Sequence, residues 1–311
     1  MKVCFVGIGS IAKRHIRNLS EICNERGIEL QIDAFRRSNS VSADNLQQIN
    51  CIYTSAEELP ADYDVIFLTN PTEYHADMLL KLHDHAKHYF IEKPVASLNT
   101  VDILKEIPYR EDSVYYVACP LRYTHVIQYL KQEINIEAVN SIRCISSSYL
   151  PDWRPGQDYR ETYSAHKDLG GGVAIDLIHE WDYITYLFGM PSAVKSFLGK
   201  VSNLEIDSDD YAIYIAKYDN MIAELHLDYF GHKSVRTVEI YTDEDTLVGD
   251  LIAGTVTYLK SGKIINFPAD RDLYQKRELE YFLDMISKNG NCSNDISNAV
   301  KILKLTQGII E

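Results

Sequence analysis

KVCFVGIGSIA, residues 2–12, joins an apolar strand to a helix through a glycine turn. Residues 3–6 are apolar throughout, which predicts a parallel strand buried on both faces. Gly7 allows a tight turn, Gly9 lets backbone N–H groups approach a pyrophosphate, and Ala12 keeps the helix close to the sheet. The helix start offers partial positive charge and unpaired donors to phosphates. Similar turns occur in sheets that bind nothing, but the position between these two elements favours a dinucleotide site.

The composition of the 311-residue chain is that of a globular protein long enough for two domains. A net charge of -14 and a pI near 5.2 argue against a nucleic-acid partner. The chain shows neither a signal peptide nor an apolar run long enough to span a membrane. Its 6 cysteines are widely spaced, which favours neither disulfides nor zinc. We therefore expect a cytoplasmic protein without a metal site.

Strand and helix patterns alternate over residues 1–120, the first predicted domain. Connections of this length between strands predict an α/β fold with a doubly wound parallel sheet, as in a Rossmann domain. The strands after the first are expected at residues 30–35, 51–53, 65–68, 88–91 and 114–119. The helices are expected at residues 12–25, 76–85 and 97–105.

The pattern changes after Pro120, and residues 121–311 form the second predicted domain. Successive strand candidates joined by tight turns predict an α+β domain with a large, mainly antiparallel open sheet. Its strands are expected at residues 141–149, 194–201, 211–218, 221–229, 236–242, 246–251 and 255–259. Its helices are expected at residues 123–133, 172–188, 272–288 and 295–309, the last packing back on the first domain. An apolar outer face of this sheet would favour a homo-oligomer.

Arg36, Arg37 and Ser38 follow the second strand, where a Rossmann domain meets the adenosine ribose. An NAD site usually has an acidic residue at the end of this strand, and Asp33 lies too early for that role. Arginine can pair bidentately with a 2′-phosphate, and Ser38 can donate a further hydrogen bond. The sequence thus favours NADP(H) over NAD(H), with a solvated basic turn as the alternative.

Two short motifs follow strand ends: Thr69-Asn70-Pro71 with His75, and Glu92-Lys93-Pro94. A proline after a strand end forces an exposed turn at the carboxyl edge of the sheet, where ligands of open α/β sheets bind. Lys93 can thus point into the crevice that holds the nicotinamide. Taken alone, each motif is only a turn, and His75 is an ordinary residue of a helix start.

Three glycines, residues 170–172, precede a helix predicted over residues 172–188. Asp176 and His179 are three residues apart, which would place them on one helix face, with Asp182 one turn further on. His179 can exchange a proton near neutral pH, and Asp176 can orient its ring or bind a substrate hydroxyl. The alternative is a surface Asp–His pair after a run of capping glycines.

The loop over residues 151–164 is dense in aromatic rings and hydrogen-bond donors. Trp153 and Tyr163 could stack on the apolar face of a sugar. Arg154 and Arg160 could bind a carboxylate or phosphate, which hints at an anionic substrate, although they could equally hold phosphates of the coenzyme. A packed surface loop is the alternative.

In combination, these motifs resemble the glucose–fructose oxidoreductase, inositol dehydrogenase and rhizopine-catabolism oxidoreductase family (Gfo/Idh/MocA). The matching residues are Gly7-x-Gly9-x-x-Ala12, Thr69-Asn70-Pro71 with His75, Glu92-Lys93-Pro94, Arg122, and Gly170–Gly172 with Asp176 and His179. The resemblance implies a Rossmann domain, a C-terminal domain whose open sheet often forms the oligomer interface, and hydride transfer between a nicotinamide and a sugar, cyclitol or related polyol. A homodimer or homotetramer would follow.

We therefore expect an NAD(P)-dependent oxidoreductase acting at a carbinol or ketone carbon of a sugar, sugar acid, cyclitol or nucleotide sugar. His179 would carry the hydroxyl proton, Asp176 would hold the substrate or orient His179, and Lys93 would stabilise the charge on the reacting oxygen or be the acid/base itself. The residues assigned to the cofactor are Gly7, Gly9, Ser10, Ile11, Ala12, Arg36, Arg37, Ser38, Thr69, Asn70, Pro71, His75, Glu92, Lys93 and Arg122. Those assigned to the substrate are Lys93, Trp153, Arg154, Tyr163, Asp176 and His179. Two other classes stay open: a non-catalytic NAD(P)-binding regulator, and an enzyme that recycles its bound cofactor during elimination or hydrolysis.

Overall fold

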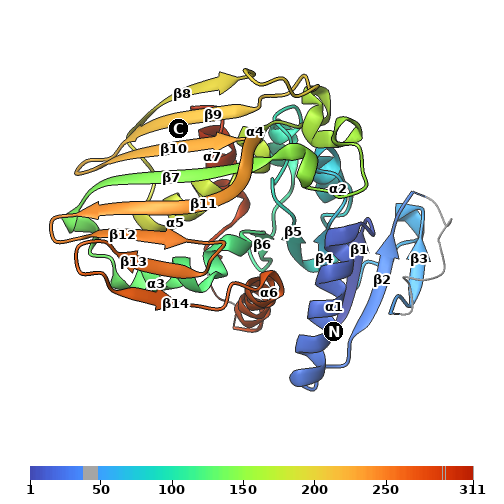
Figure 1. Cartoon of the computed structure of the whole chain (residues 1–311). Helices are drawn as coiled ribbons and strands as arrows, with labels where there is room; N and C mark the ends of the chain where they lie inside the picture. The colour runs from blue at the N-terminus through green and yellow to red at the C-terminus, as the bar shows by residue number, and fades with distance from the viewer. Residues whose placement is uncertain (38–47, 289, 291, 311) are drawn as a thin grey trace. The chain divides into compact units, whose positions relative to one another are not determined.

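The computed structural model describes residues 1–37, 48–288, 290 and 292–310 (Figure 1). The chain forms two compact units. The first unit contains residues 1–118 and 275–300, and the second contains residues 119–274 and 301–311. Each unit has its own sheet.

The sheet of the first unit is parallel and has the strand order β3-β2-β1-β4-β5-β6. This confirms the predicted doubly wound sheet. Its strands are β1 (Lys2–Val6), β2 (Gln31–Phe35), β3 (Cys51–Tyr53), β4 (Tyr63–Leu68), β5 (Ala86–Ile91) and β6 (Tyr115–Val117). The order reverses at β1, which lies between β2 and β4, and such a reversal is where open α/β sheets bind ligands.

The helices of the first unit cover its sheet and include a segment from late in the chain. They are α1 (Ser10–Glu25), α2 (His75–Lys81) and the part of α6 (Arg271–Ser287) that begins at residue 275. Phe282 of α6 packs 5.3 Å from Phe90, whose ring lies 5.2 Å from that of Phe67. The helix predicted at residues 97–105 is wrong: a 3₁₀ segment occupies Val101–Glu106, and it begins with hydrogen bonds to the third preceding carbonyl.

The sheet of the second unit has eight strands in the order β14-β13-β12-β11-β7-β10-β9-β8. All neighbours are antiparallel except β7 and β10, which confirms a mainly antiparallel sheet. The strands are β7 (Val139–Tyr149), β8 (Ala193–Gly199), β9 (Tyr211–Lys217), β10 (Ile222–Asp228), β11 (Phe230–Thr242), β12 (Thr246–Asp250), β13 (Thr255–Tyr258) and β14 (Ile264–Asn266). The short β14 was not predicted, and β11 begins earlier than expected because an irregularity in its pairing with β7 separates Phe230 from Val235.

Helices cover one face of this sheet, and Figure 1 shows α3 (His125–Glu133) and α5 (His179–Phe188) behind the strands. Trp181 of α5 packs edge-on against Tyr214 of β9 at 5.2 Å. The last helix, α7 (Ile296–Leu305), is shared between the units, and Tyr214 donates a hydrogen bond to the Thr306 carbonyl just beyond it. The opposite face of the sheet exposes apolar side chains, among them Phe197, which is 69% exposed.

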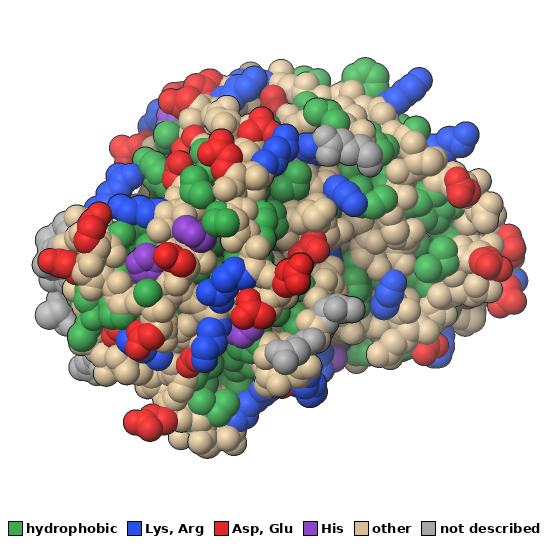
Figure 2. All heavy atoms as spheres, turned by 180° about the vertical axis from the view of Figure 1, so that it is seen from behind, with side chains coloured by type: hydrophobic (Ala, Val, Ile, Leu, Met, Phe, Trp, Pro, Cys, Tyr) green, Lys and Arg blue, Asp and Glu red, His purple; other side chains and the backbone are tan. Residues whose placement is uncertain are grey.

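Charged side chains of both signs occur together on the surface of the described chain. Figure 2 shows acidic and basic groups interspersed on the face that it presents. Within the described part of the chain, no helix is both long and apolar enough to cross a membrane.

Candidate cofactor and substrate sites

The glycine turn after β1 is held in place by the Thr69-Asn70 motif. Gly7 has a φ of +83°, and a Cβ there would lie 2.9 Å from the Asn70 Cα, so only glycine fits without strain. The Thr69 hydroxyl donates to the carbonyls of Val6 and Gly7 at 3.0 and 2.8 Å. The turn and the end of β4 therefore form one rigid structure.

The start of α1 fits the phosphates of a dinucleotide. Gly9 caps this helix without a side-chain hydrogen bond, and the first turn contains no acidic residue. A Cβ added at Gly9 would meet no described atom within 4 Å, so the glycine opens a space in front of the helix. The backbone N–H groups that begin a helix lack intrahelical partners, and Ser10, Ile11 and Ala12 supply them here. The residues present thus fit a pyrophosphate.

The end of β2, where we expect the adenosine ribose, has arginines and no accessible carboxylate on the strand. Asp33 is 1% exposed and accepts hydrogen bonds from the Tyr63 hydroxyl at 2.8 Å and the Cys51 N–H at 3.2 Å. The exposed guanidinium of Arg37 lies 4.5 Å from the ring centroid of Tyr74. Arg36 is half-buried, and the predicted partner Ser38 lies outside the described residues.

His75 connects the two motifs that follow β4 and β5. Its ring is 1% exposed, with Nδ1 2.9 Å from the Pro94 carbonyl and Nε2 2.8 Å from the Asn70 carbonyl. Burial lowers the pKa of His75, against the raising effect of these carbonyls and of Glu92. Each ring nitrogen faces a backbone carbonyl, so His75 links these two loops. Its assignment to the cofactor stays a prediction. Pro71, in the first of these loops, is exposed.

Glu92 is fixed by a buried histidine. Its Oε1 lies 2.5 Å from Nε2 of His15, a residue of α1 that is 1% exposed, and its Oε2 accepts a hydrogen bond from the Lys93 N–H at 3.3 Å. Burial alone would raise the pKa of the Glu92 carboxyl, but the hydrogen bond and charge of His15 and the charge of Lys93 hold it below its usual value. Lys93 itself is half-buried and precedes Pro94 through a cis peptide bond.

In the second unit, the single helix predicted over residues 172–188 is wrong. Two helices occupy this stretch, α4 (Val173–Asp176) and α5, and Leu177 leaves helical geometry with a φ of -97° and a ψ of 30°. Asp176 therefore ends one helix and His179, which is half-buried, begins the next, so they do not share a helix face. Gly172 before α4 has a φ of +130°, a conformation that favours glycine.

Asp176 is the centre of an aromatic cluster. It is 7% exposed and accepts a hydrogen bond from the Tyr229 hydroxyl at 2.6 Å. Tyr163 also interacts with Asp176, and burial together with the negative carboxylate raises the pKa of both phenols. Trp153 packs edge-on against Tyr229 at 5.2 Å, and the Arg154 guanidinium lies 5.4 Å from the Tyr163 ring centroid.

Four predicted substrate residues thus come together in this cluster: Trp153, Arg154, Tyr163 and Asp176. We define them, together with Tyr229, as the Asp176 cluster. Sequence reasoning missed Tyr229, which it took for the last residue of a strand predicted over residues 221–229, whereas the observed β10 ends at Asp228. The hydroxyls and carboxylate beside aromatic rings provide hydrogen-bonding and stacking groups suited to a small polar ligand.

Arg122 is 3% exposed and forms a bidentate ion pair with Asp182, at 2.9 and 2.7 Å. Its guanidinium also lies 5.1 Å from the ring of Tyr186. Asp182 lies on α5, so this ion pair holds the helix that begins with His179. The cofactor role expected for Arg122 stays a prediction.

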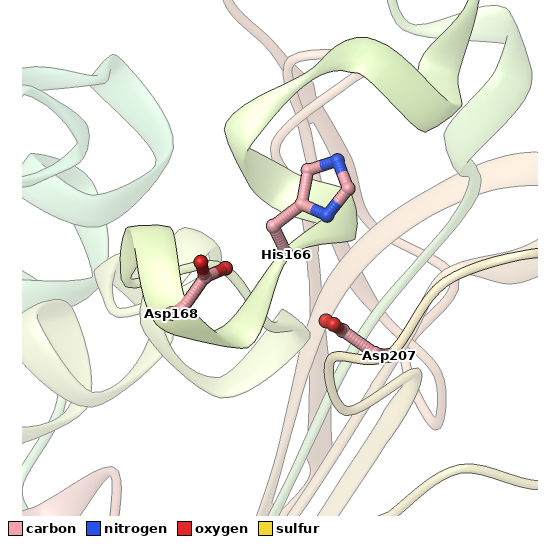
Figure 3. A group of neighbouring side chains, drawn as sticks. All are labelled: His166, Asp168 and Asp207. Carbon is pink, nitrogen blue, oxygen red and sulfur yellow. The ribbon is translucent and has the colours of Figure 1, made fainter.

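His166, Asp168 and Asp207 bring three potential metal-ligating atoms within 4.8 Å of one another (Figure 3). Nε2 of His166 lies 2.7 Å from the Arg160 carbonyl, and Asp207 accepts a hydrogen bond from the Lys167 N–H at 2.7 Å. Both aspartates are exposed. Backbone contacts account for two members, so we assign no metal to this group.

The parallel sheet, the glycine turn and the uncapped start of α1 define a dinucleotide-binding protein, joined to a second unit built on an open sheet. Residues 1–118 match the family described as "Oxidoreductase family, NAD-binding Rossmann fold". Residues 127–248 match the "GFO/IDH/MocA C-terminal domain". The chain belongs to the GFO/IDH/MocA family of oxidoreductases, as its motifs had indicated.

Relatives of known sequence are distant. An uncharacterized oxidoreductase YrbE of Bacillus subtilis is 25% identical over 224 residues, 69% of this chain and 63% of its own length. A myo-inositol 2-dehydrogenase of Thermotoga maritima is 22% identical over 193 residues, 61% of this chain and 55% of its own length. The matched part thus spans less than two thirds of either relative.

Among solved structures, levoglucosan dehydrogenase in complex with NADH is similar with a TM-score of 0.84 and 16% identity. The similarity covers 99% of this chain and 95% of that one. At this identity, it shows a shared fold.

Proposed function

We propose that the protein oxidises a secondary alcohol or reduces a ketone on a sugar, sugar acid, cyclitol or nucleotide sugar, using NAD(P)(H). The observation that carries this proposal is the Asp176 cluster, because a buried carboxylate bordered by aromatic rings suits a ring bearing hydroxyls. The names of two relatives, a myo-inositol dehydrogenase and a levoglucosan dehydrogenase, support the same substrate class.

A dinucleotide whose pyrophosphate is held at the glycine turn would supply a nicotinamide as the hydride acceptor or donor. In the oxidation, the carbinol carbon loses a hydride, its hydroxyl loses a proton, and a ketone forms. We assign this proton to His179, with Lys93 donating a hydrogen bond to the reacting oxygen as negative charge develops on it. Asp176, held by Tyr229, accepts a hydrogen bond from a substrate hydroxyl. The exchange of the two roles, with Lys93 as the acid/base, is the alternative assignment.

Hydride transfer and its dependence on these side chains test the proposal. The protein is incubated with NADP⁺ and a panel of carbohydrates, with absorbance of the reduced cofactor followed and the ketone product identified by its mass. We expect His179→Ala and Lys93→Ala each to lower kcat/KM by roughly 100-fold or more. Near-normal turnover in both variants would refute the assignment. Product formation without a net change in reduced cofactor would instead support the recycling class.

For the cofactor, we propose a preference for NADP(H). The support is that Asp33 is turned into a buried hydrogen-bond network, while Arg37 is exposed just beyond β2. Arginine at this place can bind a 2′-phosphate. Arg37→Gln should weaken NADPH binding about ten-fold and leave NADH binding unchanged. Equal effects on both cofactors, or tighter binding of NADH by the wild type, would reject the preference.

We also propose a homodimer or homotetramer formed through the outer face of the second sheet, in the cytoplasm. The strand register places Phe197, Ile215 and Ile222 on this face, where they are 69%, 42% and 45% exposed. The cytoplasmic location rests on the free state of all six cysteines. Light scattering should give a mass two or four times 35.6 kDa, and Phe197→Glu with Ile215→Glu should reduce it to one chain. A wild-type monomer would contradict the proposal.

A further inference from the structure

We propose that the substrate carries an anionic group, a carboxylate or a phosphate, and that Arg154 binds it. The inference rests on the proposed function and narrows its substrate class. It concerns the Asp176 cluster alone, and the experiment below keeps its failure distinct from a failure of the redox activity.

Arg154 differs from the other arginines around it in its charge partners. Four of the six arginines of the second unit have a carboxylate oxygen within 4.0 Å, namely Arg122, Arg143, Arg160 and Arg236. Among the described residues Arg154 and Arg271 have none, and of these two only Arg154 lies in the loop over residues 151–164. Arg154 is exposed, and among the described residues no carboxylate lies within that distance of it. In a chain with a net charge of -14, a guanidinium that pairs with none of the abundant carboxylates is available to an external anion.

The contrast with Arg160 is local, because both arginines belong to the same loop. Arg160 forms hydrogen bonds with Asp158 at 2.7 and 3.0 Å and with Glu205 at 2.9 Å. The carboxylates of Asp158 and Glu205 therefore neutralise the charge of Arg160. Of the two arginines that the sequence suggested as anion ligands, only Arg154 remains a candidate. Arg160 in turn provides a matched control for any effect of charge in this loop.

Arg154 is placed where it can act together with the polar centre of the cluster. Its guanidinium lies over the Tyr163 ring, 5.4 Å from the centroid, and the same tyrosine interacts with Asp176. One tyrosine thus separates a free positive charge from a buried carboxylate. A ligand with hydroxyls and an anionic group satisfies both ends: its hydroxyls donate to Asp176, and its oxyanion pairs with the planar donors of Arg154.

Trp153 gives this inference a readout that needs no turnover. The chain has 2 tryptophans, and Trp181 is 0% exposed in the core, while Trp153 is half-buried against Tyr229. A ligand that reaches the cluster should change the fluorescence of Trp153 and leave that of Trp181 unaffected. Trp153→Phe should remove the signal, which identifies its source.

The test compares anionic probes with their neutral counterparts by Trp153 fluorescence and thermal shift. D-glucuronate is paired with D-glucose to test a carboxylate, and UDP-N-acetylglucosamine with N-acetylglucosamine to test a phosphate. We expect the wild type to bind one anionic probe at least about ten-fold more tightly than its neutral partner. Arg154→Gln should abolish this difference and leave neutral binding unchanged, while Arg160→Gln retains it.

Three results would overturn the inference. In the first, neither anionic probe binds more tightly than its neutral partner. In the second, Arg154→Gln weakens neutral and anionic probes alike. In the third, it weakens NADPH binding, which would assign the guanidinium to the coenzyme. Hydride transfer from a neutral sugar by the wild type, together with no tighter binding of either anionic probe, would support the redox function while rejecting this inference. Anion binding that depends on Arg154, without hydride transfer to any probe, would support the anion site while rejecting the redox function.

Discussion

The substitution Tyr229→Phe removes the hydroxyl that hydrogen-bonds to Asp176 and leaves the Asp176 carboxylate in place. Tyr229 is 0% exposed, and its hydroxyl donates to Asp176 at 2.6 Å. A hydrogen bond to a charged group contributes about 1.5–3 kcal/mol. Since Asp176 is 7% exposed, water cannot readily replace the lost donor. We expect Tyr229→Phe to lower the free energy of unfolding by about 1.5–3 kcal/mol, measured by urea denaturation.

The same variant separates the two roles open to Asp176. In the structure, Asp176 and His179 lie on different helices, and one oxygen of Asp176 is bound by Tyr229. We therefore expect Asp176 to hold the substrate, so Tyr229→Phe should raise KM about ten-fold or more and change kcat much less. A fall in kcat at unchanged KM would instead show that Asp176 orients His179.

Tyr218 offers a matched control for this substitution. Its ring is 7% exposed, and its hydroxyl has no hydrogen-bond partner among the described residues. Tyr218→Phe removes a buried hydroxyl that makes no bond, so stability should stay within about 0.5 kcal/mol of the wild type or rise. The reasoning is refuted if Tyr229→Phe matches Tyr218→Phe in stability and the wild type in KM.

Three further predictions concern the framework of each unit. Gly7→Ala should lower the free energy of unfolding by about 1–3 kcal/mol in a denaturation experiment, because its φ is +83° and its Cβ would meet Asn70; unchanged stability would contradict the turn geometry. Asp182→Asn should lower the free energy of unfolding by about 3–5 kcal/mol, because it leaves the buried Arg122 unpaired. The double variant Arg122→Met with Asp182→Leu should lose less stability, and an equal or larger loss would refute this prediction. The pKa of Glu92 is held low by His15, so its stabilising effect is present at neutral pH and lost on acidification. The stability difference between the wild type and Glu92→Gln should accordingly shrink below about pH 4, and a constant difference would argue against it.

The parts of the fold that could be predicted from the sequence are those with a local signal. The strands of the first unit are runs of apolar residues because their side chains are buried. Val3 and Phe5, for example, are both 0% exposed. The turn at Gly7 and the alternation along β9 and β10 were equally visible. Each depends on residues close together in the chain, where periodicity and turn chemistry apply.

The features that sequence reasoning missed depend on contacts between distant residues. The break between α4 and α5 falls at Leu177 and Ile178, which are apolar and continue a helical pattern. Tyr229 is one of 22 tyrosines, and only a contact across 53 residues distinguishes it. The ring nitrogens of His75 face the carbonyls of Pro94 and Asn70, a contact between two loops that the local sequence does not reveal.

A titration of the protein and its Gly9→Val variant with NADPH tests the dinucleotide site at the start of α1. Gly9 has a φ of -85°, and a Cβ there meets no described atom within 4 Å, so the Gly9→Val variant should fold, with a small loss of stability because valine is a poor N-cap residue. The same side chain would occupy the space that we assign to the pyrophosphate. The account predicts saturable binding by the wild type and at least roughly ten-fold weaker binding by the variant. Failure of the wild type to bind NADPH or NADH, or equal binding by a folded Gly9→Val variant, would contradict it.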